Sequence, residues 1–442
     1  MMELNGKRVL VIGLGKTGRS AARFLAARGA RLILVDKRAD LEAEDLPADA
    51  EIHTGGEDPA WVDRVDLVVP SPGVPRDNVL LTRASARRLP ILSEIEIAGR
   101  YLTCGIVGIT GTNGKSTTTT MLAEILRAGG GRTFAGGNLG TPLVEAVDKG
   151  YETVVAEISS FQLEWVQSFR PRVGIFLNVS EDHCERYRDL DEYSEFKARL
   201  FANQRAEDWA VLNRDDPRVW TLAKHLRARV VGFGESRAHH GSAVWLDGRA
   251  LRFSVEGCEG LIRMTAFRLP GRHNLSNAMA AAGGALALGL APDVIEAVLA
   301  EFRGLPHRLE FVRERAGVVF LDDSKSTNVD GAVAALASCS APVIWVAGGV
   351  DKGGDYAPLR PLLSAKVRTA ILMGPARERM MRTLQGATEV QLVETLSQAV
   401  TAAADAARKG DTVLLSPACS SFDQFTDYAQ RGRVFKELVM AL

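Results

Sequence analysis

Short apolar runs that end in glycine or polar residues recur through the first 96 residues. "KRVLVIGLG" (7–15), "RLILVD" (31–36) and "VDLVVPSPGV" (65–74) have the length and composition of buried strands. Between the first two, "SAARFLAARG" (20–29) has apolar residues at helical spacing and ends in glycine. Strand, helix and strand in this order predict a parallel sheet covered by helices, in a first domain of residues 1–96.

The same alternation continues through a second block, which we assign to residues 97–303. A strand, a glycine loop and a helix are predicted in "CGIVGITGTNGKSTTTTMLAEILRAGG" (104–130). "TVVAEISS" (153–160) and "VGIFLNVSEDH" (173–183) are strand-like runs with polar ends, and "HNLSNAMAAAGGALALG" (273–289) is a predicted helix. "SAVWLDGRALRFSVEG" (242–257) alternates on both sides of Asp247-Gly248, which predicts a hairpin.

A third block, residues 304–442, has its own series of apolar runs. They are "VVFLDD" (318–323), "APVIWVAGG" (341–349), "RTAILMG" (368–374) and "DTVLLSPA" (411–418). The sequence therefore predicts three α/β domains in series, which agrees with a length of 442 residues.

Composition and charge narrow the class of protein. Lys+Arg and Asp+Glu number 54 each, so the formal net charge is zero and binding to nucleic acid or an anionic membrane is not expected. The sequence contains no apolar run of the roughly 18 residues that a membrane span needs. The odd number of cysteines (5) and the lack of a signal peptide favour reduced thiols in the cytoplasm.

The first glycine loop has the spacing of a dinucleotide-binding turn. Gly13, Gly15 and Gly18 lie between a predicted strand and a helix, and Asp36 ends the next strand. A nicotinamide cofactor, a simple packing turn, or a grip on another diphosphate such as that of a UDP-sugar would each explain this pattern.

The second glycine loop is a more specific signal for a nucleotide. In "TGTNGKST" (110–117), Gly114, Lys115 and Ser116 match the end of a phosphate-binding loop, but Ile109 stands where the common form has glycine. Backbone N–H groups can surround phosphates, Lys115 adds a positive charge, and Ser116 or Thr117 offers a hydroxyl to Mg²⁺. We therefore predict that this loop binds ATP.

Carboxylates at two other strand ends suggest a metal site beside this loop. Glu157 ends one predicted strand, and Glu181, Asp182 and His183 follow another. In open α/β sheets, ligands bind where the carboxyl ends of the strands lie. A polar cap would also explain an isolated Asp-His pair, but two such ends next to a phosphate loop favour Mg²⁺.

The motifs, taken together and in order, resemble those of the Mur ligase family of peptidoglycan synthesis, and among these the glutamate-adding members. The matching segments are "GITGTNGKSTTT", "GGNLG", "EISSFQLE", "NVSEDH", "FKARLF", "GRHNLSNAMAA", "GLPHRLE", "DDSKSTN", "GGVDKGGD" and "LLSPACSSFDQF". The resemblance covers nearly the whole chain and accounts for the unusual phosphate loop. It implies a Rossmann-like N-terminal domain, a central domain with a P-loop ATPase-like parallel sheet, and a Rossmann-like C-terminal domain.

The resemblance implies an ATP-dependent ligase that joins D-glutamate to UDP-N-acetylmuramoyl-L-alanine through an acyl phosphate. Such an enzyme serves cell-wall synthesis and thereby cell shape, division and the cell cycle. It is expected to be a cytoplasmic monomer with two Mg²⁺ sites. Because a cationic lysine cannot ligate Mg²⁺, the metal-ligand role implied for Lys197 requires a carbamate formed with CO₂.

The resemblance also assigns roles to individual residues. The catalytic ones are Lys115, His183 and Lys197. The ATP contacts are Gly111, Thr112, Asn113, Gly114, Lys115, Ser116, Thr117, Asn274, Asn277, Arg308, Asp323 and Lys325. The UDP-sugar contacts are Thr17, Asp36, Arg38, Gly73, Asn138, Ser159 and His183. The glutamate contacts are Thr327, Lys352, Ser421 and Phe422, and the metal ligands are Ser116, Glu157, His183 and Lys197.

Alternatives of other classes remain at this point. A nicotinamide-dependent oxidoreductase would use residues 13–18 and leave Lys115 without a role. A regulatory nucleotide-binding module would not need Glu157, His183 and Lys197. A related ligase would add L-glutamate or another amino acid. Lys16, Phe422 and Tyr428 stand where family members vary, so the shape of the two substrate pockets is open.

Overall fold

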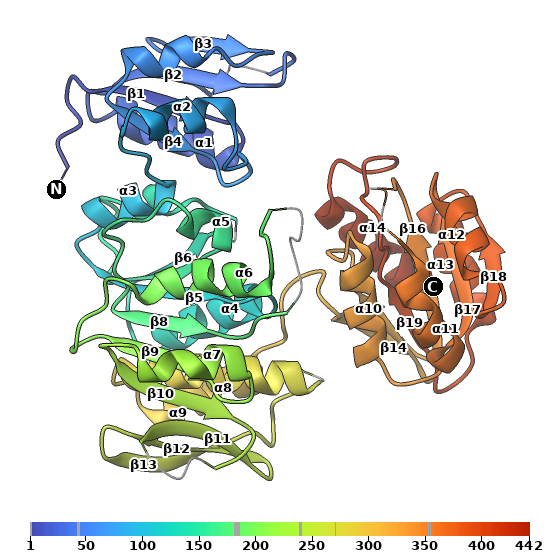
Figure 1. Cartoon of the computed structure of the whole chain (residues 1–442). Coiled ribbons are helices and arrows are strands. Elements are labelled where there is room, and N and C mark those ends of the chain that lie inside the picture. The colour runs from blue at the N-terminus through green and yellow to red at the C-terminus, as the bar shows by residue number, and fades with distance from the viewer. Residues whose placement is uncertain are drawn as a thin grey trace. The chain divides into compact units, whose positions relative to one another are not determined.

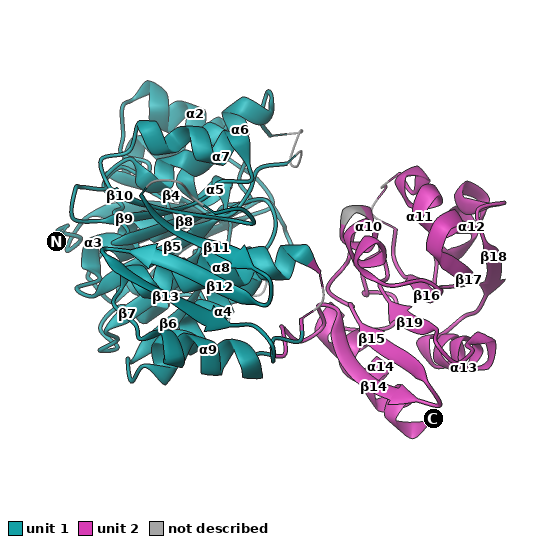
Figure 2. Ribbon diagram, turned by 90° about the horizontal axis from the view of Figure 1, so that it is seen from below, with its two compact units in different colours: residues 1–268, 272–302 teal, residues 269–271, 303–442 magenta. Residues whose placement is uncertain are grey.

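In a computed structural model of the chain, the described residues form three β-sheets with associated helices (Figure 1). The structure describes residues 2–41, 45–138, 140–180, 186–237, 241–269, 271–351, 353 and 355–442, except the side chain of residue 330. Two compact units divide the chain, residues 1–268 with 272–302, and residues 269–271 with 303–442 (Figure 2). The predicted class of three α/β domains is confirmed, with two of the sheets in the first unit.

The N-terminal sheet has four parallel strands in the order β3-β2-β1-β4. Its strands are β1 (Arg8–Ile12), β2 (Arg31–Asp36), β3 (Glu51–Thr54) and β4 (Leu67–Pro70), and its helices are α1 (Lys16–Ala26) and α2 (Val79–Ala86). Apart from Arg8 and Arg31 at their starts, β1 and β2 are buried throughout, which explains their continuous apolar sequences. The strand–helix–strand prediction is confirmed here.

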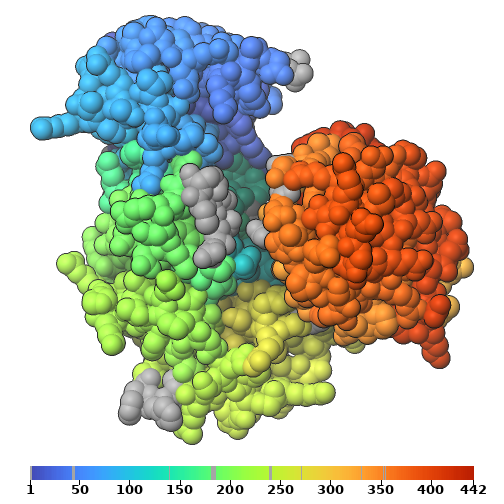
Figure 3. All heavy atoms as spheres, turned by 45° about the vertical axis from the view of Figure 1, so that its right-hand side comes forward, coloured from blue at the N-terminus to red at the C-terminus, as the bar shows by residue number. Residues whose placement is uncertain are grey.

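Helix α3 (Glu94–Tyr101) leads into the central sheet and packs on a short 3₁₀ helix, η2 (Leu143–Ala146). One hydrophobic core runs through both sheets of the first unit, from Val9 and Leu34 to Phe176 and Leu212. The space-filling view shows the N-terminal segment (blue) adjoining the central one (cyan and green) directly (Figure 3).

The central sheet has nine strands in the order β13-β12-β11-β10-β9-β8-β5-β7-β6. The strands are β5 (Gly105–Thr110), β6 (Thr133–Gly137), β7 (Thr153–Glu157), β8 (Val173–Phe176), β9 (Trp209–Asn213), β10 (Arg229–Gly234), β11 (Ser242–Asp247), β12 (Ala250–Val255) and β13 (Cys258–Arg263). The helices are α4 (Lys115–Ala128), α5 (Ser160–Leu163), α6 (Leu190–Ala198), α7 (Pro217–Thr221), α8 (Arg272–Ala287) and α9 (Pro292–Glu301). Strands β11 and β12 form the hairpin predicted around Asp247-Gly248.

The order β8-β5-β7 decides which loops meet. Ile109 of β5 pairs with Glu157 of β7, and Thr110 pairs with Phe176 of β8. All three strands are parallel, so their carboxyl ends lie at one edge of the sheet. The segments after β7 and β8 therefore flank the phosphate-loop motif that follows β5.

The second unit contains a sheet of six strands in the order β14-β15-β19-β16-β17-β18. Its strands are β14 (Glu310–Arg315), β15 (Val318–Asp322), β16 (Val343–Gly348), β17 (Val367–Met373), β18 (Glu389–Leu392) and β19 (Thr412–Leu415). Its helices are α10 (Val329–Ser338), α11 (Arg360–Lys366), α12 (Arg377–Leu384), α13 (Leu396–Ala406) and α14 (Tyr428–Ala441). Only β14 is antiparallel to its neighbour, and the two faces of the sheet carry separate hydrophobic cores.

Within the described part of the chain, none of the helices combines the length and the apolar character that crossing a membrane requires.

Candidate active site

The phosphate-loop motif forms a turn that depends on its two glycines. Strand β5 ends at Thr110, Gly111 has φ 152° and Gly114 has φ 83° directly before α4. A Cβ on Gly111 would lie 3.0 Å from Cβ of Leu177, and one on Gly114 would lie 2.2 Å from Oδ1 of Asn277. Both the backbone conformation and the close neighbours therefore require glycine.

Asn178, just after β8, holds this loop from one side. Its carbonyl oxygen accepts a hydrogen bond from Thr112 N (3.0 Å), and its Oδ1 accepts one from Asn113 N (2.8 Å). Its Nδ2 donates to the Asn113 carbonyl oxygen (3.1 Å). Two loop amides are thus engaged by the protein, and the loop leads directly into the N-terminus of α4, a helix end that favours an anion. Sequence analysis did not single out Asn178, although it lies in the strand-like run 173–183.

Two lysine amines meet at one backbone oxygen of the loop. Nζ of Lys115 donates to the carbonyl oxygens of Gly111 (2.9 Å) and Thr112 (2.8 Å). Nζ of Lys197, from α6, donates to the same Gly111 oxygen (2.8 Å), and Lys197 is only 1% exposed. Its amine also lies 4.3 Å from the ring centroid of Tyr193. The structure thus brings together two lysines that are distant in the sequence.

Glu157 lies at the other side of the loop with one oxygen available for a ligand. Nδ2 of Asn138 donates to Glu157 Oε1 (2.7 Å), while Oε2 is buried without a hydrogen-bond partner among the described residues. A buried carboxylate oxygen without a partner is costly, and Mg²⁺ would satisfy it. Ser116 is buried at the start of α4, so its hydroxyl is a second oxygen of the kind Mg²⁺ prefers. The donor set at this edge therefore fits Mg²⁺.

Other predicted residues of the first unit lie close to this centre. Asn277 packs against Gly114 and donates through Nδ2 to Oδ1 of Asn274 (3.4 Å). Ser159 caps α5 in a capping box with Gln162, so its hydroxyl also has a structural role. His183, predicted to bind metal and UDP-sugar, lies outside the described residues, and so does Lys352 of the predicted glutamate set.

The first glycine turn packs helix α1 closely on its own loop. A Cβ on Gly18 would lie 1.9 Å from the carbonyl oxygen of Gly13, whereas Gly15 has open space around its Cα. Ser71, after β4, donates through Oγ to the same Gly13 oxygen (2.6 Å). Gly18 is therefore a packing glycine, and Gly15 leaves room for a ligand to approach the backbone.

Asp36 is held by the protein's own groups. Its Oδ2 accepts from Leu14 N (2.7 Å) and from Arg38 (2.9 Å), and its Oδ1 accepts from Arg38 Nε (3.0 Å). The hydrogen bond from Arg38 lowers the pKa of Asp36 to about 2. The carboxylate therefore orients Arg38, whose side chain remains 53% exposed. Gly73 lies in the loop after β4, and the half-buried Thr17 lies in the first turn of α1.

In the second unit, Asp323 lies directly after β15 in a buried polar setting. Leu309 N donates to its Oδ1 (3.2 Å), Ser416 Oγ donates to its Oδ2 (2.8 Å), and burial raises its pKa to about 6. Nζ of Lys325 lies 3.9 Å from the ring centroid of Tyr428, while Arg308 is exposed. Among the predicted glutamate contacts, Thr327 is half-buried, Ser421 is buried and Phe422 is 72% exposed.

A buried arginine that sequence analysis missed supports these loops. Arg431 of α14 is 1% exposed and donates to Oγ of Ser324 (3.0 Å), to the Ser324 carbonyl oxygen (2.9 Å) and to the Cys419 carbonyl oxygen (3.2 Å). Burial lowers its pKa to about 10. An arginine in an amphipathic helix gives no sign in the sequence that it points inward.

Three residues of the second unit have the spacing of metal ligands but are explained by ion pairs. Ligand atoms of His307, Glu310 and Asp322 lie within 4.8 Å of one another. Nδ1 of His307 is 2.6 Å from Asp322 Oδ2, and Lys436 Nζ donates to both oxygens of Glu310 (2.9 and 3.1 Å). Lys436 offsets the charge of Glu310, and Asp322 has the His307 ring as a hydrogen-bond partner, so these contacts account for the spacing without a metal ion.

Comparisons with known proteins give one answer along the whole chain. Three family descriptions match: "Mur ligase MurD-like, N-terminal domain" at residues 7–93, "Mur ligase middle domain" at 109–285, and "Mur ligase, glutamate ligase domain" at 307–419. The chain is similar to proteins named UDP-N-acetylmuramoylalanine–D-glutamate ligase. It is 45% identical over 448 residues to that of Geotalea uraniireducens, covering 100% of this chain and 99% of the relative. The protein of the same name from Geobacter metallireducens is also 45% identical over 448 residues, with the same coverage of both chains.

Solved structures support the fold. The UDP-N-acetylmuramate-alanine ligase of Thermotoga maritima superposes with a TM-score of 0.58 at 20% identity, covering 98% of this chain and 99% of that one. A pseudomurein peptide ligase type C of Methanothermus fervidus gives the same TM-score and identity, with 99% and 100% covered. At this level of identity the likeness concerns the fold alone.

Proposed function

The chain belongs to the Mur ligase family, and on this premise we propose that it joins D-glutamate to UDP-N-acetylmuramoyl-L-alanine in peptidoglycan synthesis, with hydrolysis of ATP to ADP and phosphate. The observation that carries the proposal is full-length similarity, at 43–45% identity, to relatives that bear this activity in their names. A nicotinamide-dependent oxidoreductase is not supported, because the first glycine turn falls within the matched Mur ligase N-terminal domain.

The geometry of the phosphate loop suits the first chemical step. The alanyl carboxylate of the UDP-sugar attacks the γ-phosphorus of ATP, which forms an acyl phosphate and releases ADP. Both partners are anions, so the step needs positive charge and fixed orientation. Lys115 would supply charge at the start of α4, a helix end suited to phosphate binding.

In the second step the amine of glutamate attacks the acyl carbon. A tetrahedral intermediate forms, loses phosphate and leaves an amide, while the amine gives up a proton. The residues proposed to orient glutamate are Thr327, Lys352, Ser421 and Phe422. Glutamate brings two carboxylates, and a cation such as Lys352 would offset the cost of removing them from water.

Mg²⁺ is required by enzymes of this family, and when bound it neutralises phosphate charge. We propose Ser116 and Glu157 as ligands on the ATP side, supported by Oε2 of Glu157, which is buried and has no hydrogen-bond partner in the described part of the chain. His183 and Lys197 are proposed for the second ion. For Lys197 the proposal includes a carbamate, in which the amine nitrogen bonds to the carbon of CO₂ and loses a proton.

Burial supports this modification of Lys197. Its amine is almost fully buried and shares the Gly111 carbonyl oxygen with Lys115, so a second positive charge there is unfavourable. A carbamate replaces that charge with anionic oxygens, the donors that Mg²⁺ prefers.

The remaining nucleotide contacts are proposed unit by unit. In the first unit, Gly111, Thr112, Asn113, Gly114, Thr117, Asn274 and Asn277 serve ATP, and Thr17, Asp36, Arg38, Gly73, Asn138, Ser159 and His183 serve the UDP-sugar. In the second unit, Arg308, Asp323 and Lys325 serve ATP.

The proposed domains are residues 1–96, 97–303 and 304–442. The enzyme is proposed to act as a monomer in the cytoplasm.

The test is phosphate release from ATP and Mg²⁺ with UDP-N-acetylmuramoyl-L-alanine and one amino acid at a time. D-glutamate should support turnover, and L-glutamate, L-alanine and diaminopimelate should give only background. Product mass should increase by one glutamyl residue. Equal turnover with L-glutamate, or turnover only with another amino acid, would contradict the proposed specificity.

A further inference from the structure

The loop that follows β4, residues 71–78, is fastened at both of its ends. At the first end, Ser71 N donates to the Ile12 carbonyl oxygen (2.8 Å), and its Oγ donates to that of Gly13 (2.6 Å). This end therefore belongs to the first glycine turn. Gly73, in the middle, has open space around its Cα.

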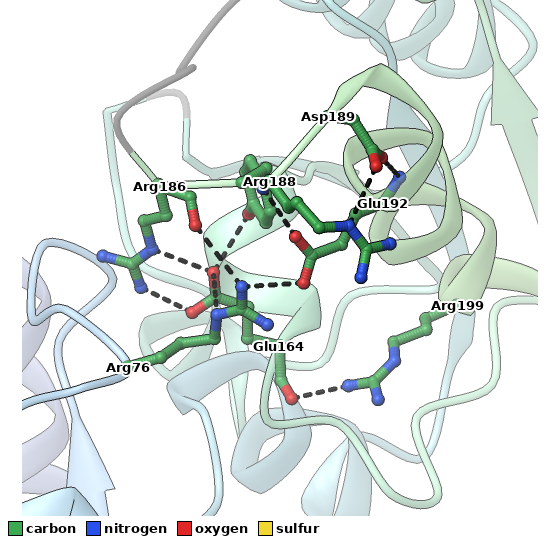
Figure 4. Close-up of polar contacts among 8 residues, drawn as sticks. Arg76, Glu164, Arg186, Arg188, Asp189, Glu192 and Arg199 are labelled. Atoms are coloured by element: carbon green, nitrogen blue, oxygen red, sulfur yellow. Dashed lines mark hydrogen bonds and ion pairs between the residues drawn. The ribbon is translucent and has the colours of Figure 1, made fainter.

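At the other end, the Arg76 side chain lies beside Glu164, Arg186 and Glu192, which belong to the segments around α5 and α6 (Figure 4). Its Nη2 donates to Glu192 Oε1 (2.9 Å) and to the Arg186 carbonyl oxygen (3.3 Å). Its Nε lies 4.0 Å from Glu164 Oε1, and its guanidinium lies 4.6 Å from the ring centroid of Phe196. These partners all lie in the segment 164–196, and the side chain is 32% exposed.

The carboxylate that Arg76 approaches, that of Glu164, is fully buried, but its charge is paired without Arg76. Glu164 Oε1 accepts from Nε of Arg186 (2.9 Å) and from the hydroxyl of Tyr187 (3.0 Å), and its Oε2 accepts from Nη2 of Arg186 (2.5 Å). Arg186 thus supplies the paired charge that a buried carboxylate requires. Removal of Arg76 would leave this pair intact, so Glu164 would not become an unpaired buried charge.

The helix bound by Arg76 is the one that carries Lys197. Glu192 and Phe196 lie on α6, and Phe196 directly precedes Lys197. Lys197 in turn contacts the carbonyl oxygen of Gly111 in the phosphate loop. A short path therefore runs from the first glycine turn, through the loop 71–78 and Arg76, to α6 and the phosphate loop.

We propose that Arg76 is a positioning residue that couples the uridine-diphosphate end of the substrate to its reacting end. By tying the loop that carries Gly73 to α6, it fixes the distance between the N-terminal sheet and Lys197. Binding of the remote diphosphate then holds the alanyl carboxylate in place for attack, which raises the rate of reaction. The inference rests on the proposed function of the chain.

The test compares two substrates in Arg76→Ala, Arg76→Lys and the unsubstituted enzyme. One is UDP-N-acetylmuramoyl-L-alanine, and the other is N-acetylmuramoyl-L-alanine, which lacks the uridine diphosphate. Arg76→Ala should lower kcat/KM for the full substrate ~10-fold or more and leave that for the short one unchanged. Arg76→Lys should recover part of the loss, because it retains the charge opposite Glu192.

Arg83→Ala is the matched control. Arg83 pairs with Asp63 at the surface of the same sheet, and Asp63 retains Arg87 as a partner. The Arg83→Ala enzyme should have the same kcat/KM as the unsubstituted enzyme with both substrates. If kcat/KM falls equally for both substrates in Arg76→Ala, Arg76 only stabilises α6. If kcat/KM falls for neither substrate, Arg76 is an ordinary surface residue. Both results would overturn the proposal.

Calorimetry gives a second measurement that needs no turnover of the short substrate. UDP alone should bind Arg76→Ala as tightly as it binds the unsubstituted protein. The full substrate binds more tightly than UDP, and this gain in affinity should be smaller in Arg76→Ala. A weaker affinity for UDP itself, or an unchanged gain, would contradict the coupling. If the unsubstituted enzyme does not join D-glutamate to the full substrate, the proposed function fails first, and this is seen before any variant is compared.

Discussion

At the scale of single residues, Lys115 and Lys197 place two amines on the same carbonyl oxygen, that of Gly111. The shared oxygen orders both side chains before any phosphate binds. Each amine nevertheless has a different expected task. Lys115 starts helix α4 and is proposed to act on the transferring phosphoryl group, whereas Lys197 is buried and is proposed to serve a metal.

Lys115→Ala should therefore lower kcat about 10²–10³-fold while the affinity for ATP changes only a few-fold, since the charge matters most as the phosphoryl group transfers. Initial rates at saturating ATP and calorimetry with a non-hydrolysable ATP analogue would measure the two effects. Lys149→Ala, at an exposed lysine of the same unit, is the control. Normal turnover of Lys115→Ala at saturating ATP would refute the role.

Lys197→Ala should be nearly inactive, and short carboxylates such as acetate should restore part of the activity by supplying the missing oxygens. Lys197→Arg should be inactive and not respond to acetate, because its bulk still fills the site. In the unsubstituted enzyme, removal of CO₂ should lower activity reversibly, and ¹³C-labelled bicarbonate should give a carbamate signal by NMR. An unmodified amine in fully active enzyme would disprove the carbamate.

At the scale of elements, the two glycine loops differ in what their glycines do. Gly18 is required where α1 packs against the Gly13 carbonyl, while Gly15 has an ordinary φ of −71° and open space. The loop at 111–114 instead requires glycine at both its ends. Substitution can therefore separate packing from binding in the first loop.

Gly18→Ala should destabilise the protein by about 1–3 kcal/mol or more, because the added Cβ would overlap a backbone oxygen that cannot move aside easily. Gly15→Ala should leave the free energy of unfolding unchanged but weaken UDP-sugar binding by crowding the diphosphate. Urea denaturation and calorimetry with UDP would separate the two effects. A stable Gly18→Ala protein would contradict the packing role.

Helix α3 contains a buried acid that makes stability depend on pH. Glu94 Oε1 accepts a hydrogen bond from Val144 N (2.6 Å), and burial raises the pKa of Glu94 from 4.5 to about 7. The folded state therefore holds the proton more tightly than the unfolded chain. It follows that stability falls as pH rises from about 4.5 to about 7, and the penalty is complete above that range.

Glu94→Gln should raise the free energy of unfolding at pH 8 by up to about 3 kcal/mol and change it little at pH 5, because the amide retains an acceptor for Val144 N without a buried charge. Denaturation curves from pH 5 to 8 would show this. Glu96, on the same helix, is the control. Burial alone would raise its pKa, but hydrogen bonds from Ser168, Gln167 and Arg100 lower it, so Glu96→Gln should destabilise the protein at neutral pH. A Glu94→Gln protein less stable at pH 8 would contradict the prediction.

At the scale of the whole molecule, the second unit contains all that a domain needs to fold alone. Its sheet has buried apolar clusters on both faces, one with Trp345 and Leu363 and the other with Ile344 and Phe435. About 140 residues is an ordinary domain size.

Residues 303–442, produced alone, should therefore fold and unfold cooperatively, as followed by circular dichroism on heating. The fragment should not hydrolyse ATP, because the phosphate loop belongs to the first unit. Trp345→Ala in the fragment should cost about 3–5 kcal/mol, which tests whether its core is native. A fragment without a cooperative transition would show that it needs the rest of the chain.

The sequence by itself determined the features that local patterns encode. The buried runs of β1, β5, β16 and β19, and the glycine-lysine loop before α4, follow from burial on both sheet faces and from backbone conformations that favour glycine. The order of the motifs was also sufficient to indicate the family. Short polar strands such as β3, β14 and β18 were not predicted, because partly exposed strands do not need a continuous apolar run.

Only the tertiary structure decided which distant residues meet. The strand order β8-β5-β7 brings Asn178 and Glu157 to opposite sides of the phosphate loop. Lys197 contacts Gly111 across 86 residues of sequence, and Arg76 contacts Glu192 across 116. Such contacts depend on how sheets and helices pack, and a helix that carries Lys197 or Arg431 inward has the same local pattern as one that carries it to solvent. The physical reason is that burial is a property of the assembled core, which no short stretch of sequence contains.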